Sequence, residues 1–293
     1  MRCGLVTLVG RPNVGKSTLV NRLVGRKITI TSKRPQTTRS IVRGVVNDPA
    51  GDWQMVLVDT PGLHRPRNEL GARLNRLVHG SLAESDVICF LVDATQPIGP
   101  GDRLIARRVR EVDRPVVLAV TKLDAAAREQ VLAQLTTAGE WDLAAYVPIS
   151  SISGRGIPEL QQELSSRLPE GPALFPVDMD TDQPEAFLVG EIIREKFLDL
   201  LHEELPHSLH VSLHEMEEEE GLLRIAADLL VERQSQKGIV IGKGGSMLEH
   251  AGSQAREELE RLLGTKVHLA LQVKVEPDWQ RRPTSLDRLG FHR

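Results

Sequence analysis

Cysteine is nearly absent from this chain of 293 residues, which contains only Cys3 and Cys89. Two cysteines cannot build a disulfide framework, and because Cys89 lies in a segment that we predict as a strand and Cys3 lies just before another, we interpret both as small buried apolar residues. Long apolar stretches are also missing, since the run Val87–Val92 is far shorter than the roughly 20 residues needed to cross a bilayer. The beginning of the chain has no basic-then-apolar secretory pattern. We therefore expect a cytoplasmic protein.

Charge is distributed unevenly along the chain. The total is −3, yet residues 1–170 contain 23 Lys and Arg against 17 Asp and Glu, a balance of +6. Residues 171–293 contain 14 against 23, a balance of −9. The length and the 40% hydrophobic content are those of a globular protein with two domains. The acidic second half argues against a broad electrostatic footprint on nucleic acid there.

Residues 1–168 alternate short apolar runs with amphipathic stretches of helical period. This alternation predicts an α/β domain with a mostly parallel sheet covered on both faces. Two of the runs, split by a polar turn, predict an antiparallel hairpin at one edge. The predicted strands are Leu5–Val9, Ile41–Val46, Met55–Val58, Val87–Val92, Val116–Val120 and Ala145–Ile149. The predicted helices are Ser17–Val24, Leu70–Ala83, Leu104–Val112, Ala125–Thr137 and Ile157–Leu168.

A change of composition marks the start of the second half. Residues 169–184 are rich in Pro, Gly and Asp, which predicts a linker. Beyond it, the predicted elements follow in the order α-β-β-α-α-β, which is a smaller α+β domain. They are a helix over 185–204, strands over 208–216 and 222–231, a short helix, a helix over 246–263 and a strand over 266–275. The acidic run Glu217–Glu220 is predicted to be a solvated hairpin turn.

A glycine-rich segment follows the first predicted strand and precedes a predicted helix. Its residues are Gly10, Arg11, Pro12, Asn13, Val14, Gly15, Lys16 and Ser17, and Thr18 follows them. The two glycines let the backbone curl so that several N–H groups point inward. Lys16 can reach the β- and γ-phosphates of a nucleotide, and the Ser17 hydroxyl can ligate Mg²⁺. The strand, loop and helix together predict a phosphate-binding loop.

A second segment, Asp59-Thr60-Pro61-Gly62, stands at the end of a predicted strand, where ligands bind in open α/β sheets. An aspartate there can hold Mg²⁺ through water, and the Gly62 N–H can contact the γ-phosphate. Asp59 alone would be an ordinary turn residue. Its position after the phosphate loop predicts that this segment responds to the presence of the γ-phosphate.

Two further segments, each also at the end of a predicted strand, predict which base is bound. In Thr121-Lys122-Leu123-Asp124, the Asp124 carboxylate can accept two hydrogen bonds from guanine that adenine cannot donate. Ser150 and Ser151 end the next strand, and their backbone would meet the guanine oxygen. Alone, Asp124 would be a helix cap. The order and spacing of all these segments predict a guanine nucleotide.

The second half contains a glycine-rich turn between two predicted helices. This segment, Gly242-Lys243-Gly244-Gly245, resembles the signature of a KH module. Its glycines permit a turn against which the backbone of single-stranded RNA can lie, and Lys243 supplies charge for a phosphate. Ile239 and Ile241 would line the groove for the bases. The surrounding α-β-β-α-α-β order predicts RNA binding rather than a simple turn.

Together the nucleotide-binding segments resemble those of small GTPases, and Thr31–Arg39 is similar to the first switch segment of the Era family. The resemblance spans nearly the whole chain. It implies a P-loop GTPase domain over residues 1–168, a linker over 169–184, and a type II KH domain with a C-terminal tail over 185–293. It also implies that the ligands are GTP, GDP and Mg²⁺, and that GTP is hydrolysed to GDP and phosphate.

By the same resemblance, Thr38 is the switch residue that ligates Mg²⁺ together with Ser17 and Asp59. Thr37 is the alternative, and both threonines could instead be ordinary residues that lead into the edge strand. The implied catalytic residues are Lys16, Thr38 and Gly62.

Three positions bear on affinity and hydrolysis. Thr121 stands where the family motif has Asn, and a shorter hydroxyl can tie its loop to the neighbouring segments less well. Leu63 stands where Ras-like proteins place a water-orienting Gln, so that device is absent. Asn13 resembles the residue that holds a potassium ion against the phosphates in related GTPases, although it could be a loop-stabilising amide. Our hypothesis is a slow, cation-assisted GTPase.

The resemblance also implies the partners. Era-family proteins bind the 3′ end of small-subunit ribosomal RNA and assist maturation of the small ribosomal subunit, and some associate peripherally with the membrane. We expect no DNA partner and a monomeric chain. Two alternatives are an RNA-binding adaptor with a weak or vestigial GTPase and a GTPase coupled to an RNA-modification partner. The tail from Trp279 to Phe291 is expected either to pack on the KH module or to help engage RNA.

Overall fold

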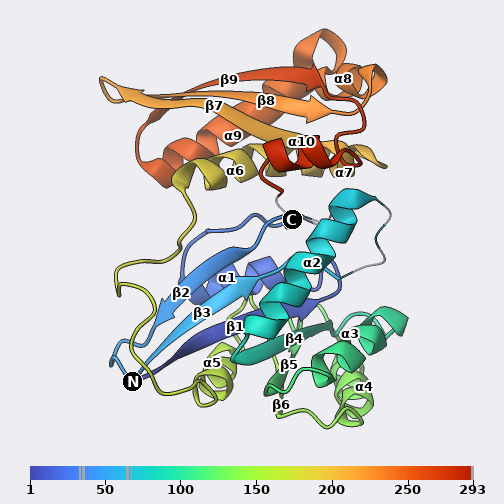
Figure 1. The fold of residues 1–293 in the computed structure, drawn as a ribbon, viewed down its shortest axis with the longest axis vertical. Helices are drawn as coiled ribbons and strands as arrows, with labels where there is room; N and C mark the ends of the chain where they lie inside the picture. Colours follow the sequence, from blue (N-terminus) through green and yellow to red (C-terminus); the bar gives the residue numbers. More distant parts are fainter. Residues whose placement is uncertain (33, 35–36, 64–65, 67, 292–293) are drawn as a thin grey trace. The chain divides into compact units, whose positions relative to one another are not determined.

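The computed structural model describes residues 1–32, 34, 37–63, 66 and 68–291. They divide into two compact units (Figure 1). The first unit comprises residues 1–29, 38–66 and 71–182, and the second comprises 30–37, 67–70 and 183–293. Two short segments of the first half of the sequence therefore belong to the second unit. No helix in the described part of the chain is long and apolar enough to cross a membrane.

The first unit contains one sheet of six strands in the order β2-β3-β1-β4-β5-β6. The strands are β1 (Arg2–Gly10), β2 (Val42–Asn47), β3 (Trp53–Asp59), β4 (Val87–Asp93), β5 (Val116–Thr121) and β6 (Ala145–Pro148). Only β2, paired with β3, runs antiparallel to its neighbour among these strands. The predicted edge hairpin and parallel sheet are both confirmed. All the carboxyl ends of the parallel strands therefore lie at one edge of the sheet.

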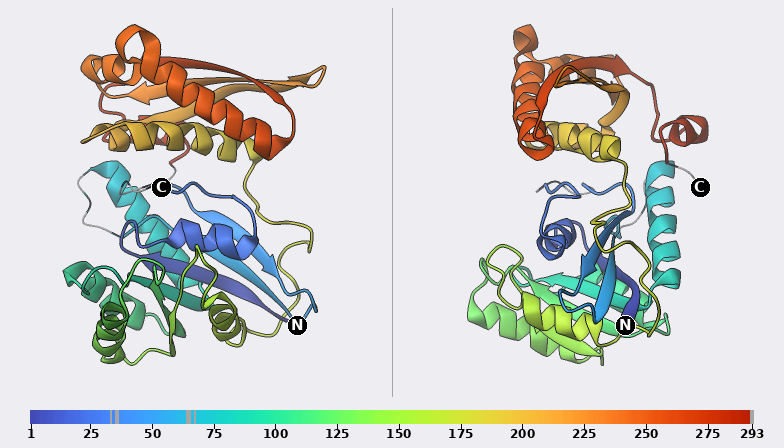
Figure 2. Two further views of the ribbon diagram at one scale, coloured as in Figure 1. Left: turned by 180° about the vertical axis from the view of Figure 1, so that it is seen from behind. Right: turned by 90° about the vertical axis from the view of Figure 1, so that its left-hand side faces the viewer.

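Among the described residues of this unit, five helices cover the sheet. They are α1 (Lys16–Val24), α2 (Glu69–Glu84), α3 (Pro100–Arg110), α4 (Arg128–Gly139) and α5 (Ile157–Ser165). Val78 of α2, Ile105 of α3 and Ala138 of α4 share one buried cluster with apolar residues of β4 and β5, so these helices cover the same face. On the other face lies α1, as the two opposite views of Figures 1 and 2 show. The sheet is thus buried on both sides, which explains why its central strands are almost wholly apolar.

The segment predicted as a linker runs along the open edge of this sheet. The backbone N–H of Val45 in β2 donates to Asp180 O at 2.8 Å, and Gly44 forms an isolated bridge with Thr181. Gln54 of β3 accepts hydrogen bonds from the backbone N–H of Leu174 and Phe175 at 2.8 and 3.0 Å. The polypeptide up to residue 182 is therefore fixed to the first unit.

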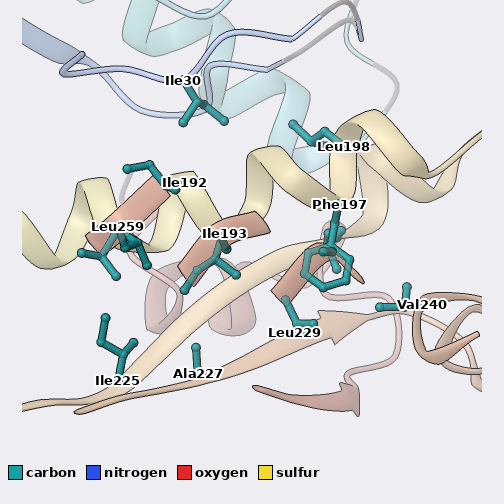
Figure 3. Packing of buried hydrophobic residues seen from close by; sticks show 14 of the residues in the cluster. Ile30, Ile192, Ile193, Phe197, Leu198, Ile225, Ala227, Leu229, Val240 and Leu259 are labelled. Carbon is teal, nitrogen blue, oxygen red and sulfur yellow. The ribbon is translucent and has the colours of Figure 1, made fainter. Parts of the chain in front are cut away.

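The second unit contains a three-stranded sheet in the order β7-β8-β9. Its elements are α6 (Glu185–Leu200), α7 (Leu205–Ser208), β7 (His210–Glu219), β8 (Leu222–Val231), α8 (Gln234–Ile241), the 3₁₀ turn η1 (Lys243–Gly245), α9 (Ser246–Leu263), β9 (Lys266–Val275) and α10 (Pro283–Arg288). β7 is antiparallel to β8, and β9 is parallel to it. The main core lies between the sheet and the helices α6 and α9, as Figure 3 shows for Ile193, Phe197, Leu229 and Leu259.

The C-terminal tail packs onto the second unit. Trp279 is fully buried, its indole N–H donates to Ser208 O at 2.9 Å, and its ring lies 5.9 Å from that of Phe291. The expectation that the tail packs on the module is confirmed. The prediction of a turn at Glu217–Glu220 was wrong for its first three residues, which extend β7 and pair with Leu222, Leu223 and Arg224 of β8.

Candidate functional site

The phosphate-binding loop joins the end of β1 to the start of α1. Gly15 has φ +101° and precedes the first helical residue, and Asn13 has φ +64°. A Cβ on Gly10 would lie 2.8 Å from the Leu91 carbonyl oxygen. The sequence therefore bends here as only glycine readily allows, and it turns the N-terminus of α1 toward the loop. Backbone N–H groups at a helix N-terminus attract anions, as a phosphate site requires.

Lys16 extends into this loop. Its side chain is buried, and Nζ donates to the carbonyl oxygens of Gly10 and Arg11, each at 3.3 Å. Burial lowers the pKa of Lys16 to about 8, and the nearby Asp59 partly opposes that effect. An ammonium group in a glycine-rich loop at a helix N-terminus is suited to bind terminal phosphates of a nucleotide.

Ser17, Thr38 and Asp59 converge next to the loop. Ser17 Oγ donates to Asp59 Oδ2 at 2.7 Å and lies 3.0 Å from Thr38 Oγ1. Thr29 Oγ1 donates to the same carboxylate oxygen at 3.3 Å. The other oxygen, Asp59 Oδ1, is buried and has no hydrogen-bond partner among the described residues. Oxygen ligands of this kind suit Mg²⁺, so the three predicted ligands fit that metal.

Gly62 lies against the phosphate-binding loop. A Cβ at this position would be 2.9 Å from Pro12 Cγ and 3.0 Å from Pro12 N. A side chain here would therefore force the two segments apart. The structure thus places the Asp59–Gly62 segment beside the loop, as the sequence predicts. It also explains why glycine is needed at position 62.

The segment that follows β5 is attached to the loop by a hydroxyl group. Thr121 Oγ1 lies 2.8 Å from Val14 O and 3.1 Å from Val92 O. Thr121 itself is buried. The threonine therefore links the base-recognition segment to the phosphate-binding loop, which is the connection that we expected to be weaker here than with asparagine. One hydroxyl proton can serve only one of the two carbonyls at a time.

Lys122 is held by Asp93, a residue that the sequence analysis missed. Lys122 has φ +62°, and its Nζ lies 2.6 Å from Asp93 Oδ2. The other oxygen, Asp93 Oδ1, accepts hydrogen bonds from Thr95 N at 2.8 Å and Thr95 Oγ1 at 2.6 Å. Burial alone would raise the pKa of Asp93, but these hydrogen bonds lower it below its usual value. Asp93 ends β4 at the ligand edge of the sheet, and that position was the available signal.

Asp124 is exposed at the same edge. Its Oδ1 accepts a hydrogen bond from Ser150 Oγ at 2.5 Å, and Ser150 Oγ in turn accepts one from Ser153 N at 3.0 Å. Ser151 follows in the turn after β6. The structure therefore joins the two segments that we predicted to recognise guanine, and the Ser150 hydroxyl orients the Asp124 carboxylate.

The first switch segment is divided between the two units. Of residues 31–39, the structure describes Thr31, Ser32, Arg34 and Thr37–Arg39; the rest of the segment lies outside the described residues. Ile30–Thr37 belongs to the second unit, where Ile30 is part of the buried core (Figure 3).

Two side chains of α6 hold this segment through its backbone. Glu195 Oε1 accepts a hydrogen bond from Thr31 N at 2.8 Å, and the buried Arg194 donates to Thr37 O while pairing with Glu191 at 2.6 Å. The next residue, Thr38, belongs to the first unit. The peptide bond after Thr37 therefore joins the residue that Arg194 of α6 holds to Thr38, whose hydroxyl lies 3.0 Å from that of Ser17.

The glycine-rich turn of the second unit separates α8 from α9. Gly242, Gly244 and Gly245 have φ values of +76°, +62° and +87°, and a Cβ on Gly242 would lie 2.7 Å from Met247 N. Lys243 is exposed. Ile239 is 52% exposed, and Ile241 packs against the core as a partly buried residue. The open glycine turn with an exposed isoleucine beside it fits a strand of RNA laid along the backbone.

Comparison with known proteins gives the family. Residues 5–122 match the family model described as 50S ribosome-binding GTPase, and residues 204–280 match the KH domain model. The chain is 50% identical over 296 residues to GTPase Era of Mycobacterium tuberculosis (strain H37Rv), with 98% of each chain covered. GTPase Era of Mycobacterium avium (strain 104) is also 50% identical, with 99% of each chain covered. This chain belongs to the Era family of GTPases.

Two solved Era structures resemble the whole chain. One is a variant of Aquifex aeolicus Era bound to GDP and AlF4⁻, with 39% identity, a TM-score of 0.95 and 100% of each chain covered. The other is Era in complex with MgGDPNP and nucleotides 1506–1542 of 16S ribosomal RNA, with 39% identity, a TM-score of 0.96 and the same coverage. The expectation of an Era-family chain with a P-loop GTPase domain and a KH domain is confirmed.

Proposed function

We propose that this Era-family GTPase binds the single-stranded 3′ end of small-subunit ribosomal RNA and acts as a nucleotide-controlled factor in maturation of the small ribosomal subunit. The related Era that was solved with nucleotides of 16S ribosomal RNA supports this partner. The positive-φ glycine turn and the exposed Ile239 support the surface that would contact the RNA. In this proposal, Ile239, Ile241 and the turn Gly242–Gly245 bind the RNA.

The observation that carries the proposal is the divided switch segment. Ile30–Thr37 belongs to the unit that holds the KH turn, whereas Thr38 lies 3.0 Å from Ser17 at the phosphate-binding loop. A γ-phosphate that orders Thr38 must act on the backbone that Arg194 holds. We infer that GTP favours the RNA-binding state, and because coupling is reciprocal, RNA must change nucleotide affinity or hydrolysis.

In the proposed nucleotide site, each of the residues described above has its own role. Mg²⁺, when bound, neutralises charge on the phosphates, and Ser17, Thr38 and Asp59 would hold it. Lys16 binds the β- and γ-phosphates, the Gly62 N–H contacts the γ-phosphate, and Asp124 selects guanine. The further residues that contact the nucleotide in this proposal are Gly10, Arg11, Pro12, Asn13, Val14, Gly15, Thr18, Thr121, Lys122, Ser150 and Ser151. We assign the catalytic roles to Lys16, Thr38 and Gly62.

Asn13 is proposed to hold a potassium ion that supports hydrolysis. The residue is exposed in the phosphate-binding loop and has φ +64°, a left-handed conformation that asparagine adopts more readily than most residues. GTP turnover is expected to be faster in potassium than in sodium at matched ionic strength. Equal rates in the two salts would assign Asn13 to loop structure alone.

We assign residues 1–168 to the GTPase domain, 169–184 to the connecting segment and 185–293 to the KH domain with its tail. We propose a monomer in the cytoplasm with a fraction bound peripherally to the membrane.

The decisive experiment measures RNA affinity in each nucleotide state. A single-stranded RNA that matches the 3′ end of the small-subunit RNA is titrated with the full chain loaded with a non-hydrolysable GTP analogue or with GDP. Tighter binding in the GTP state supports the proposal, and equal affinity in both states refutes the coupling. Gly244→Asp should abolish RNA binding and spare GTP binding, whereas Lys16→Ala should do the reverse. A retained RNA affinity in Gly244→Asp would refute the role of the turn.

A further inference from the structure

The side chain of Arg11 leaves the phosphate-binding loop and lies on the first turn of α3. Its Nη1 donates a hydrogen bond to Asp102 Oδ2 at 3.1 Å. A Cβ on Gly101 would lie 3.2 Å from Arg11 Cδ. Glycine is unfavourable inside a helix, but a larger residue at position 101 would crowd the arginine. The first turn of α3 therefore has room for the Arg11 side chain because it contains a glycine.

Asp102 is itself held by the start of the helix. Its side chain is 6% exposed, and Oδ2 also accepts a hydrogen bond from the backbone N–H of Gly99 at 2.9 Å. Asp102 lies in the first turn of α3, where the helix dipole favours a negative charge. A hydrogen bond between two charged groups is stronger than one between neutral groups. The buried carboxylate is therefore suited to anchor the Arg11 guanidinium.

The backbone of Arg11 also contacts Lys16. Lys16 Nζ donates to the Arg11 carbonyl oxygen at 3.3 Å, so the position of the Arg11 backbone affects where the ammonium group lies. The next residue, Pro12, lies against Gly62, which belongs to the segment predicted to respond to the γ-phosphate. Asp102, in contrast, belongs to α3. The ion pair therefore supports the phosphate-binding loop from an element outside the two switch segments.

The segment of residues 93–102 contacts both the phosphate-binding loop and the base-recognition segment. At its beginning, Asp93 pairs with Lys122 at 2.6 Å, and at its end, Asp102 pairs with Arg11 at 3.1 Å. All four of these residues line one cavity of about 190 Å³. The same connection between β4 and α3 therefore carries a carboxylate for each of the two segments.

We propose that Asp102 is a positioning residue for the GTPase reaction, and that it acts through Arg11 to fix the phosphate-binding loop and with it Lys16. The inference rests on the proposed nucleotide site, in which this loop binds the phosphates. Without the ion pair, the Arg11 carbonyl oxygen remains in the chain, but its position is less well fixed, and Lys16 loses a defined acceptor. Bound nucleotide should then dissociate faster. Stability should change little, because Arg11 is 46% exposed and ion pairs at such positions contribute little to folding.

The test measures how fast the full chain releases a fluorescent GDP analogue when unlabelled GDP is added in excess. Asp102→Asn removes the charge but keeps an oxygen that can accept the hydrogen bond from Gly99 N. Arg11→Gln removes the opposite charge. Each variant should release the analogue about threefold to fivefold faster, the effect of losing one partly exposed ion pair. The double variant should be no faster than the faster single variant, because both changes break the same contact.

Three further measurements separate positioning by the ion pair from a general structural effect. The ratio of release rates between Asp102→Asn and the unmodified chain should fall toward one as salt is raised, because salt screens a partly exposed pair. Arg11→Lys should release the analogue more slowly than Arg11→Gln, since the contact uses one nitrogen, Nη1, which an ammonium group can replace. The matched control Glu163→Gln removes a carboxylate that pairs with Arg167 on α5 at 2.5 Å, and it should leave release unchanged.

Several outcomes would overturn the proposal. Additive effects of Arg11→Gln and Asp102→Asn, or an effect of Arg11→Gln alone, would show that the arginine acts on the nucleotide without Asp102. A rate ratio that is independent of salt, equal release by Arg11→Lys and Arg11→Gln, or an equal effect of Glu163→Gln would show that the charge pair is not the cause. If the unmodified chain does not retain the GDP analogue, the proposed nucleotide site itself fails, and that outcome differs from all the others.

Discussion

Asp93 illustrates how a single carboxylate can position a lysine, Lys122, that we propose to contact the nucleotide. It holds Lys122 Nζ at 2.6 Å and is itself held by two groups of Thr95. Asp93→Asn is expected to weaken GDP binding about tenfold, because a hydrogen bond to a charged group contributes about 1.5 to 3 kcal/mol. Isothermal titration calorimetry with GDP measures this loss. Asp113→Asn, at an exposed position, should change nothing, and an unaltered affinity in Asp93→Asn would contradict the role.

Thr121 leads to a second prediction at this scale, since its hydroxyl lies between two carbonyl oxygens. Removing it in Thr121→Ala should cost about 1 kcal/mol of nucleotide affinity, the net value of one hydrogen bond. Thr121→Asn introduces two amide protons that can serve both carbonyls, so GDP should bind at least as tightly as in the unmodified chain. Thr137→Ala, which removes an exposed helix hydroxyl bonded to Ala133 O, is the control. Weaker binding by the asparagine variant would show that its side chain does not fit the buried site.

At the scale of elements, the turn between β6 and α5 contains two positive-φ glycines, Gly154 and Gly156, and backbone atoms enclose Gly156 more tightly. Gly156 has φ +75°, and a Cβ there would lie 2.1 Å from Pro148 O. Gly156→Ala should therefore lower the free energy of unfolding by about 1 to 3 kcal/mol or more, the usual cost of strained backbone. Urea denaturation measures this change in the free energy of unfolding. Gly80→Ala inside α2, where no neighbouring atom lies within 4 Å, should instead raise stability by up to about 1 kcal/mol.

Element bounds could be predicted where local patterns decide them. The limits of β8, α9 and β9 matched the structure, because apolar periodicity and the flanking glycines define them. β1 begins at Arg2 rather than Leu5, because Arg2 pairs with Trp53 of β3. Pairing with a strand that lies about 50 residues away cannot be inferred from the local sequence pattern. α4 begins at Arg128 rather than Ala125, because the base-recognition turn continues to Ala127. The Glu217–Glu219 extension of β7 likewise depends on pairing across the hairpin.

The candidate site was predictable to a similar extent. Lys16, Ser17, Asp59 and Asp124 were predicted from motif order, because binding of phosphate, Mg²⁺ and guanine needs those residue types at those strand ends. Their supporting contacts did not follow from the sequence. Asp93 belongs to no motif. The hydrogen bonds of α6 to Thr31 and Thr37 join residues more than 150 positions apart. Such contacts depend on tertiary packing, which a local pattern does not encode.

For the molecule as a whole, Arg194 offers the most direct test of nucleotide control. The side chain is buried, pairs with Glu191 and donates to Thr37 O. Arg194→Lys keeps a charge but loses the forked geometry, so it should reduce the difference in RNA affinity between the GTP and GDP states. Couplings of this kind are typically about 1 to 3 kcal/mol. RNA titrations in both nucleotide states measure the difference.

A matched variant keeps that result interpretable. Arg256→Lys changes an arginine of α9 that pairs with Glu260 at 3.2 Å and has no contact with the switch segment among the described residues. It should leave the affinity difference intact. The same loss in both variants would indicate a general weakening of the second unit, and an unchanged difference in Arg194→Lys would remove α6 from the control of Thr37.

The hydrogen bonds between β2 and residues 180–181 have a practical consequence. β2 is the outermost strand of its sheet, and a bare outermost strand invites self-association through unsatisfied backbone groups. A recombinant GTPase fragment that stops at residue 168 would leave this strand uncovered and should precipitate or form oligomers, whereas one that stops at residue 182 should remain dispersed. Light scattering of the two fragments would distinguish them, and the stretch that joins the two units would then also count as a shield against aggregation.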